Sequence, residues 1–406
     1  MMISYQIFLF IVSPLLAGLT IRHYLNHKDI RFLWQRFFAL QLPNSNNAIW
    51  FHCASVGEVM TAIPLINLYK EKHPDQEFLI STTTITSARV CENKLPFVTH
   101  CYLPLDYRNN IKRFLNKTKP ERLIVLETEI WPNLFSITKN NGISITIING
   151  RLSKKTLNAK LWFKKLFYTS IQHVDSIFCR SEFDSKAYMS LGGHDNQVET
   201  VGNLKFSAQF PKAESTSSLI QRPYVVAAST HKYEEKKIVE LWNASDHGNL
   251  LLIIVPRHPE RAAEIIDDIS AICTEVKLRS KQENVTNTTD VYLADTMGEL
   301  PVLFQYAEFV IMGGSFVNTG GHNILEPANF GKAIIYGESM KNFEAENKLF
   351  LENEAAIQVN NDAEAITAIN TLVSDQAVRD RLGNNAKELI TKNSNIAEQY
   401  LKKLTQ

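Results

Sequence analysis

Residues Gly313–Pro327 read GGSFVNTGGHNILEP, and the organisation of the whole chain can be worked out from this stretch. It follows an apolar run, Phe309–Met312, that is typical of a buried parallel strand. A strand, a glycine-rich loop and a helical pattern in this order bring backbone N–H groups to an anion. Glu326, in the first helical turn, is placed to accept hydrogen bonds from ribose hydroxyls. The stretch therefore predicts a nucleotide site, with an ordinary strand-to-helix turn as the alternative.

The same alternation of apolar strands and helical patterns extends in both directions from this loop. The strands expected in the first half are 49–53, 78–81, 98–103, 123–126, 143–148, 176–179 and 198–201. Those expected in the second half are 224–228, 250–255, 291–293, 309–312, 333–336 and 356–359. This rhythm predicts an α/β protein with two doubly wound, Rossmann-like domains that face a cleft. We expect a membrane anchor at 1–21, domains at 22–206 and 223–390, a linker at 207–222 and a C-terminal helix at 391–406.

Composition and cysteine usage narrow the class of protein. With 45% hydrophobic and 21% charged residues the chain is an ordinary globular protein, and a net charge of +1 gives no reason to expect a nucleic-acid partner. Its five cysteines include no Cys-x-x-Cys pair, which indicates free thiols rather than a disulfide framework or a zinc site. The sequence also lacks an Asp-x-Asp, so no carboxylate-held metal on a diphosphate is expected.

The N-terminal segment has a different composition. Residues 1–21 carry no charged side chain, and Arg22, Lys28 and Arg31 follow. A signal peptide would carry its basic residues before the apolar run, so we expect a single membrane anchor with the body of the protein in the cytoplasm, and a cleaved signal peptide is the alternative. Pro14 leaves a shallow re-entrant anchor open beside a full span. The stretch Phe32–Leu42 fits a helix on a membrane surface or one packed on its own domain.

Polar motifs stand at the ends of predicted strands in the first half. Glu58 lies in the first turn of a helix that follows the first strand. Burial there would raise its pKa towards that of a general base. The alternative is that Glu58 only compensates the helix dipole. Glu127 and Glu129 lie two residues apart at another strand end, and strand alternation would turn both towards the cleft. Arg151 and Lys205 end two later strands and are candidates for binding an anionic sugar or phosphate.

Two further loops in the second half have the same placement. Pro256-Arg257 ends a strand with a guanidinium that is able to grip a phosphate. Met297–Glu299 follow the next strand and precede a helix, so their amides form a second candidate anion site. Each loop is a weak signal alone, but the carboxyl ends of parallel strands meet at one edge, so we expect these loops to share a pocket with Gly313–Pro327.

Taken together, eight motifs in order resemble the 3-deoxy-D-manno-octulosonic acid (Kdo) transferases, which move Kdo from CMP-Kdo to a lipid A precursor in lipopolysaccharide synthesis. They are ASVGE (54–58), ETEIWPN (127–133), NGRLS (149–153), GNLKF (202–206), STH (229–231), PRHPER (256–261), DTMGEL (295–300) and GGHNILEPA (320–328). The sequence departs from the family at Lys232-Tyr233, where the family has Pro-Gly, and at Ile324, where it has Pro.

The resemblance implies a glycosyltransferase of the B type at the inner membrane, transferring Kdo to lipid IVA with inversion, with an N-terminal acceptor domain and a C-terminal CMP-sugar domain. It also implies that no metal or other cofactor takes part. Glu58 matches the family's catalytic base. Matches to its CMP contacts are Pro256, Arg257, Met297, Gly298, Glu299, Asn323, Ile324, Leu325 and Glu326. Further candidate substrate contacts are Ser55, Gly57, Glu127, Glu129, Arg151, Lys205, Ser229, Thr230, His231, Gly314, Ser315 and Gly321. The alternative is another B-type transferase or epimerase that uses a UDP-sugar.

Overall fold

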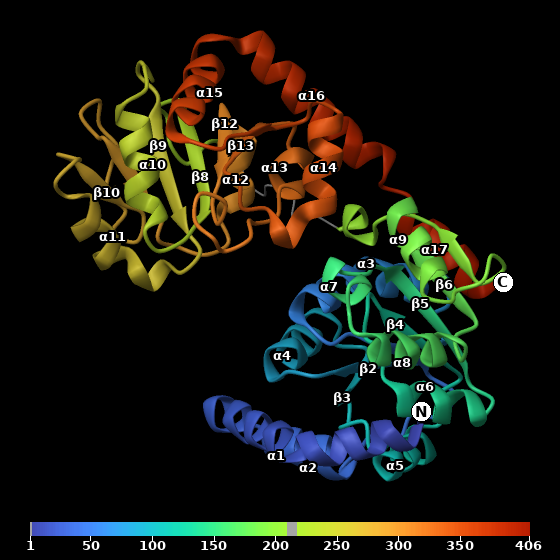
Figure 1. Cartoon of the computed structure of the whole chain (residues 1–406). Coiled ribbons are helices and arrows are strands. Elements are labelled where there is room, and N and C mark those ends of the chain that lie inside the picture. Colours follow the sequence, from blue (N-terminus) through green and yellow to red (C-terminus); the bar gives the residue numbers. More distant parts are fainter. Residues whose placement is uncertain (1, 209–216) are drawn as a thin grey trace. The chain divides into compact units, whose positions relative to one another are not determined.

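The computed structural model describes residues 2–208 and 217–406, which form two compact units. Unit 1 comprises residues 1–209 and 393–406, and unit 2 comprises residues 210–392. Each unit contains one seven-stranded sheet with helices on its faces (Figure 1). Residues 209–216 of the expected linker lie outside the described residues.

The sheet of unit 1 has the strand order β3-β2-β1-β4-β5-β6-β7, and all its neighbouring strands are parallel. The chain moves outward from β1 to β3 and then returns to β4 on the other side of β1, so the order reverses between β1 and β4. The strands are β1 (Ile49–His52), β2 (Phe78–Thr82), β3 (Thr99–Tyr102), β4 (Arg122–Leu126), β5 (Ser144–Gly150), β6 (Ser176–Cys179) and β7 (Val198–Thr200). The helices are α1 (Met2–His27), α2 (Ile30–Phe38), α3 (Val56–Lys72), α4 (Ile85–Lys94), α5 (Arg108–Thr118), α6 (Pro132–Asn140), α7 (Lys154–Leu157), α8 (Leu161–Ile171), α9 (Glu182–Ser190), η1 (Leu204–Ser207) and α17 (Ile396–Thr405).

The sheet of unit 2 has the order β10-β11-β9-β8-β12-β13-β14 and is also parallel throughout. Its order reverses between β8 and β12, which places β8 where β1 stands in unit 1. The strands are β8 (Tyr224–Thr230), β9 (Leu251–Pro256), β10 (Val276–Leu278), β11 (Val291–Leu293), β12 (Phe309–Met312), β13 (Ala333–Tyr336) and β14 (Ile357–Gln358). The helices are α10 (Glu234–Asn243), η2 (Pro259–Arg261), α11 (Ala262–Ile269), α12 (Leu300–Tyr306), α13 (Leu325–Asn329), η3 (Lys341–Phe343), α14 (Glu344–Glu352), α15 (Asp362–Ser374) and α16 (Gln376–Lys392).

The strands predicted from the sequence are all confirmed, with ends that differ by two residues at most. Each residue of β1, β9 and β12 is buried, because helices cover both faces of the sheets and the strands are therefore apolar along their whole length. β10 was not predicted, since it is three residues long with Lys277 at its centre. The five cysteines are free and buried, as their spacing indicated.

The C-terminal helix α17 returns to unit 1 after the chain has completed unit 2. Figure 1 shows this red helix beside the green strands β5 and β6. The buried hydroxyl of Tyr400 donates a hydrogen bond to the carbonyl of Gly202 (2.9 Å) and accepts one from the backbone N–H of Asn149 (3.2 Å). α17 is therefore an integral part of unit 1.

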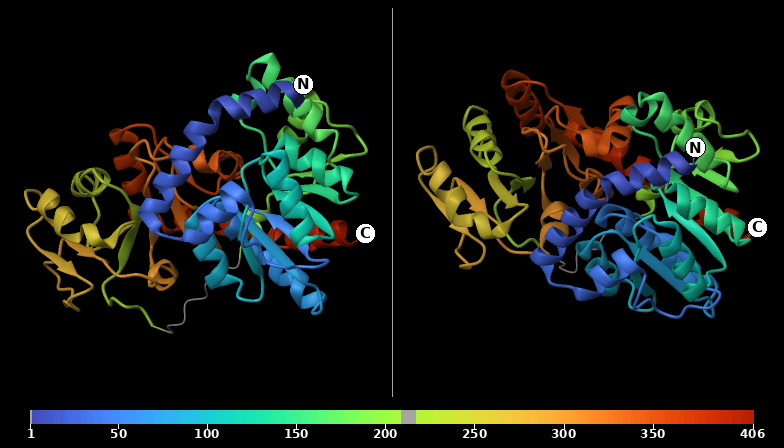
Figure 2. Two further views of the ribbon diagram at one scale, coloured as in Figure 1. Left: turned by 90° about the horizontal axis from the view of Figure 1, so that it is seen from below. Right: turned by 60° about the horizontal axis from the view of Figure 1, so that its bottom comes forward.

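The N-terminal helix α1 lies along the outside of unit 1, as the views in Figures 1 and 2 agree. Two of its polar side chains contact the rest of unit 1. The hydroxyl of Tyr5 donates to buried Asp106 (2.8 Å), and Gln6 donates to Asn133 (2.7 Å). Leu9 is buried with Leu166, but most of the large apolar side chains turn outward, and Phe10 is 80% exposed. Within residues 2–208 and 217–406, Ile3–His27 is the one helix long and apolar enough to cross a membrane, with a mean hydropathy of 1.7.

Candidate active site

Glu58 lies in the first turn of α3, directly after β1 and beside the reversal of the strand order. Ser55 caps the helix and accepts a hydrogen bond from the Glu58 N–H (3.2 Å). In return the Glu58 carboxylate accepts from the N–H of Ala54 (2.8 Å) and the hydroxyl of Ser55 (3.0 Å). This arrangement is a variant of the capping box, which explains why a Ser-x-x-Glu sequence begins the helix here. The cap also fixes the carboxylate in one orientation.

The pKa of Glu58 is raised to about 8, from an ordinary value of 4.5. Burial is the largest cause, and the negative charges of Glu129 and then Glu127 add to it. The three carboxyl groups are therefore close enough to interact. The sequence analysis attributed the placement of Glu127 and Glu129 to strand alternation, and this was wrong. β4 ends at Leu126, and both residues lie in the following loop. There Glu127 adopts a left-handed backbone with φ 56°, so strand alternation does not place these side chains.

Glu129 is kept ionised by neighbours that the sequence motifs did not reveal. Burial alone would raise its pKa, but His52, Trp131 and Arg36 together hold it below the ordinary value. The indole N–H of Trp131 donates to its carboxylate (2.9 Å), and Nε2 of fully buried His52 lies 3.9 Å from the same oxygen. That nitrogen has no hydrogen-bond partner in the described part of the chain. Arg36 comes from α2, which packs on unit 1, and burial lowers its pKa to about 10.

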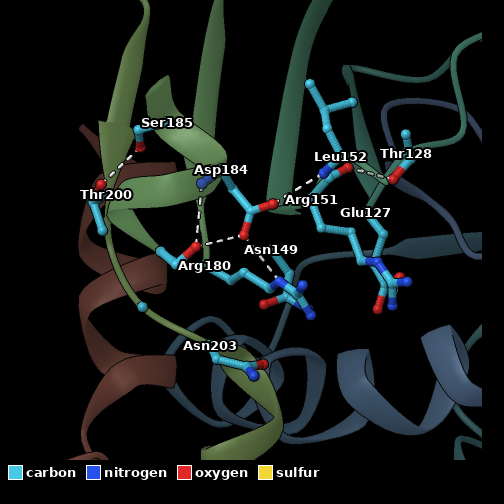
Figure 3. A network of polar contacts seen from close by, with 12 residues as sticks. Glu127, Thr128, Asn149, Arg151, Leu152, Arg180, Asp184, Ser185, Thr200 and Asn203 are labelled. Carbon is cyan, nitrogen blue, oxygen red and sulfur yellow. Dashed lines mark hydrogen bonds and ion pairs between the residues drawn. The ribbon is translucent and has the colours of Figure 1, made fainter. Parts of the chain in front are cut away.

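Arg151 lies at the end of β5, paired with Glu127 across 3.4 Å. Its loop is held from behind by Asp184, which accepts hydrogen bonds from the N–H of Leu152 (3.0 Å) and from Arg180 (3.0 Å). Figure 3 shows Asp184 between these two partners and Glu127 beside Arg151. Since Arg151 already has a carboxylate partner, it is less suited to binding a second anion. Lys205, the other basic candidate in unit 1, lies in η1.

In unit 2 the N–H groups of the glycine-rich loop are occupied by the protein itself. The buried carboxylate of Glu234 accepts from the N–H groups of Gly314 (2.7 Å), Ser315 (3.1 Å) and Phe316 (2.9 Å), and from that of His231 (3.0 Å). The expectation that this part of the loop offers open N–H groups to a ligand is therefore wrong. Glu234 was missed because a glutamate in the first turn of a helix resembles simple compensation of the helix dipole.

The remaining loop residues are tightly packed. The Ser315 hydroxyl donates to the carbonyl of Met312 (2.6 Å) and accepts from the N–H of Gly337 (2.8 Å). Gly321 has φ 76°, and a side chain at this position would meet the sulfur of Met340 at 2.4 Å. Both residues thus shape the loop from within, and the part that follows, from His322 to Glu326, carries the polar side chains.

Glu326 and Arg257 are two charged groups at this edge of unit 2. Glu326 lies in the first turn of α13, accepts a hydrogen bond from Asn323 (3.2 Å) and has a pKa raised by burial, a rise that Asn323 and Arg257 oppose. Arg257 is exposed directly after buried Pro256 at the end of β9. The other two matched residues of this loop, Ile324 and Leu325, are buried.

The loop Met297–Glu299 precedes α12. Gly298 has φ 90°, which favours glycine, and Met297 is 76% exposed. The Glu299 carboxylate accepts from Nε of Arg279 (2.9 Å), and Arg279 lowers its pKa. Its side chain is therefore engaged within the protein, which leaves the backbone and Met297 for a ligand.

The STH motif ends β8 beside the reversal of the strand order in unit 2. Ser229 adopts a left-handed backbone with φ 58°, and the buried Thr230 hydroxyl donates to Glu235 (3.1 Å). Nε2 of His231 lies 2.7 Å from Nε2 of His322, and the two rings are parallel within 1°. Left-handed residues at strand ends are a strained feature that clusters at functional sites. His322 was quoted in a motif, but its partnership with His231 could not be seen from the sequence.

The two units thus offer different chemistry at equivalent edges. Unit 1 presents a fixed carboxyl group with a pKa of about 8 next to an ionised one, which suits proton abstraction near neutral pH. Unit 2 presents Glu326, Arg257 and two histidines, which suit a ribose and an anion. In the described ranges, 2–208 and 217–406, no group of three or more His, Cys, Asp or Glu side chains is arranged to hold a metal ion.

Comparison with known proteins gives consistent matches. Residues 31–208 match the family model for 3-deoxy-D-manno-octulosonic-acid transferase (kdotransferase), and residues 246–389 match that for glycosyl transferases group 1. The chain is 34% identical to the 3-deoxy-D-manno-octulosonic acid transferase of Haemophilus influenzae over 364 residues, or 87% of this chain and 85% of the relative. It is 29% identical to the enzyme of that name from Rickettsia bellii over 418 residues, covering 100% of this chain and 99% of the relative.

Solved structures support the fold. The UDP-GlcNAc 2-epimerase of Neisseria meningitidis superimposes with a TM-score of 0.61 at 14% identity, over 88% of this chain and 99% of that one. At this identity the likeness concerns the fold alone. Together with the two parallel sheets, it confirms the predicted pair of doubly wound domains of the B-type glycosyltransferase fold.

Proposed function

The chain belongs to the 3-deoxy-D-manno-octulosonic acid (Kdo) transferase family, and on that premise we propose that it transfers Kdo from CMP-Kdo to lipid IVA and releases CMP. The family membership makes it a glycosyltransferase of lipopolysaccharide synthesis. The observation that carries the finer proposal is Glu58, a carboxyl group fixed by Ala54 and Ser55 whose pKa is raised to about 8. A fixed group that titrates near neutral pH is what a general base requires.

In the proposed reaction a hydroxyl of the acceptor attacks the anomeric carbon of Kdo. The new carbon–oxygen bond forms as the bond from that carbon to the phosphate oxygen breaks, and CMP leaves with the bonding electrons. Glu58 accepts the proton of the attacking hydroxyl. Attack from the face opposite the leaving group inverts the configuration at the anomeric carbon.

Unit 2 is the proposed donor site. Glu326 accepts hydrogen bonds from the ribose, and Arg257 neutralises the phosphate. CMP is a monophosphate and develops less charge on leaving than a diphosphate does, so we propose that no metal ion or other cofactor is needed. Turnover in the presence of EDTA should equal that without it, and a loss that added Mg²⁺ restores would contradict this part.

We further propose that α1 holds unit 1 at the cytoplasmic face of the inner membrane. The helix keeps Tyr5 and Gln6 on the protein while Ile3, Phe10 and Leu15, which are 78%, 80% and 64% exposed, point away from it. This arrangement suits a helix that lies in the membrane interface, because a helix spanning the bilayer would have to leave these contacts. Replacing Phe10 and Leu15 by Ser should release the protein from vesicles while the Tyr5–Asp106 contact and catalysis persist.

The decisive experiment is a transfer assay with product analysis. Purified protein is incubated with lipid IVA and an enzymatic source of CMP-Kdo, and the lipid is analysed by mass spectrometry. The proposal requires a gain of one or more Kdo residues, and competition by CMP stronger than that by UDP. An unmodified lipid, or a preference for UDP, would contradict it.

A further inference from the structure

Three histidines gather where the strand order of unit 2 reverses. His231 follows β8, His258 follows β9, and His322 comes from the loop after β12. The ring of His231 contacts both others, with centroids 4.9 Å from His322 and 6.1 Å from His258. The carboxyl ends of parallel strands at such a reversal are where ligands bind in doubly wound sheets. The cluster therefore occupies a ligand position, although the proposed reaction has so far given it no role.

The guanidinium of Arg257 acts on both histidines of the pair. Burial, then His231, Arg257 and His258 lower the pKa of His322 to about 4. Burial and then His258, Arg257 and Arg261 lower the pKa of His231, and Glu235 opposes this shift.

Two carboxylates lie next to His231. Glu234 accepts from its backbone N–H and from three N–H groups of the glycine-rich loop. Glu235 is paired with Arg261 (2.9 Å) and accepts from the Thr230 hydroxyl. An anion that entered here would thus meet the guanidinium of Arg257 and the imidazole donors of the two histidines.

The groups gathered at this edge are those that a nucleotide sugar requires. The backbone N–H of Arg257 donates to the carbonyl of Thr230 (3.0 Å), next to His231, and its charge acts on both His322 and Glu326, so Arg257 lies close to the histidine pair and to the ribose acceptor. If the phosphate lies at Arg257, the first group of the transferred sugar lies at His231 and His322. For a donor whose sugar is an acid, that group is the carboxylate beside the anomeric carbon.

We propose that His231 and His322 bind the carboxylate of the donor sugar, each donating one hydrogen bond from Nε2 to one carboxylate oxygen. The two Nε2 atoms lie 2.7 Å apart and share one hydrogen in this structure. A neutral imidazole can carry its proton on either nitrogen, so both rings can present an Nε2–H to an anion without gaining a proton. The assignment rests on the proposed function. Arg151, which the sequence offered as a candidate for binding an anionic sugar, is instead paired with Glu127.

The test separates the sugar from the nucleotide. The Michaelis constant for CMP-Kdo and the inhibition constant of CMP are measured for His231→Gln, His322→Gln and wild type. Losing a hydrogen bond to a charged group should raise the Michaelis constant by about ten- to a hundredfold, whereas the CMP constant stays within about twofold. His194→Gln, an exposed histidine of unit 1 bonded to Gln172, is the matched control and should change neither value.

Each other outcome has a defined meaning. Equal losses for CMP and CMP-Kdo would assign the pair to the nucleotide, and no loss for either would make it structural; both overturn the proposal. A larger selective loss in Arg151→Gln than in His322→Gln would also overturn it. CMP binding by the variants, measured by calorimetry, shows that unit 2 is still folded. A wild-type protein that does not consume CMP-Kdo would instead refute the proposed function.

Discussion

Glu58 of unit 1 and Glu234 of unit 2 occupy matching places and do different things. Each is buried in the first turn of the helix that follows the strand at the reversal of its sheet. Glu234 accepts hydrogen bonds from four backbone N–H groups, whereas Glu58 accepts two and faces two other carboxylates. Burial raises the pKa of both, but only Glu58 also has negative neighbours that raise it further.

The comparison shows how one fold separates a structural carboxylate from a reactive one. Four N–H donors use up the lone pairs of Glu234 and tie the glycine-rich loop to α10. Two donors leave Glu58 with free lone pairs, and its neighbours Glu127 and Glu129 favour its taking up a proton. Substitutions at the two positions should therefore give opposite patterns, loss of turnover at one and loss of stability at the other.

The largest expected effect is on the turnover number of Glu58→Gln. Removing a general base lowers the rate by about two to four orders of magnitude, and the Michaelis constants should change little because glutamine has nearly the same size. Steady-state kinetics with CMP-Kdo and lipid IVA measure the turnover number and the Michaelis constants. Glu127→Gln and Glu129→Gln are the controls. If either of them costs more turnover in a folded protein, the base is misassigned.

Glu234→Gln should give the reverse pattern, with stability as the main loss. Its amide nitrogen would face N–H groups that the carboxylate now accepts, so the free energy of unfolding should fall by about 2–3 kcal/mol. Urea denaturation followed by circular dichroism gives this value, with Glu58→Gln as the partner variant. An unchanged midpoint for Glu234→Gln would show that the loop does not depend on the internal carboxylate.

The pH dependence of activity tests whether the neighbouring carboxylates raise the pKa of Glu58, as no carboxylate in the described part of the chain does for Glu234. A base must be deprotonated, so kcat/KM of wild type should rise with pH through an apparent pKa near 8, the value raised by burial and by Glu129 and Glu127. Glu129→Gln removes the neighbouring charge that has the larger effect, so the rise of kcat/KM should move to lower pH. Glu127→Gln should move it in the same direction by less. If kcat/KM rises at the same pH in both variants as in wild type, these two charges do not cause the raised pKa.

The smallest expected effect concerns the turn before Glu234. Tyr233 caps α10 with φ 72° and no side-chain cap bond, where Ser55 in unit 1 caps α3 with an ordinary extended backbone. A left-handed residue with a side chain costs about 1–2 kcal/mol relative to glycine, part of which is offset by the greater freedom of glycine when unfolded. Tyr233→Gly should therefore raise the free energy of unfolding by about 1 kcal/mol.

The matched control is Tyr168→Gly, at an exposed tyrosine within helix α8. Glycine weakens a helix interior, so this variant should lose stability by about 1 kcal/mol or more. Two tyrosine-to-glycine changes of opposite sign would isolate the backbone effect at Tyr233. A loss in both variants would show that the Tyr233 side chain contributes more than its backbone costs.

The sequence predicted the sheets better than it predicted the contacts at their edges. Strands such as β9 and β12 are buried along their whole length, and a continuous apolar run reports such burial directly. The partner of the Gly314 N–H is Glu234, eighty residues earlier in the chain, and no local pattern reports such a pairing. His52 and Arg36 were missed for the same reason, since they join the site through tertiary packing on Glu129.

The return of α17 to unit 1 has a consequence for the synthesis of the protein on the ribosome. α17 follows all of unit 2 in the sequence, yet its Tyr400 binds the backbone at Asn149 and Gly202 in unit 1. Domains generally fold as units in the order in which they emerge. Unit 1, although made first, therefore lacks one of its helices until the whole chain has been made. The N-terminal unit is the last to be completed, and released chains that end before Ile396 should leave unit 1 open to proteases while unit 2 is protected.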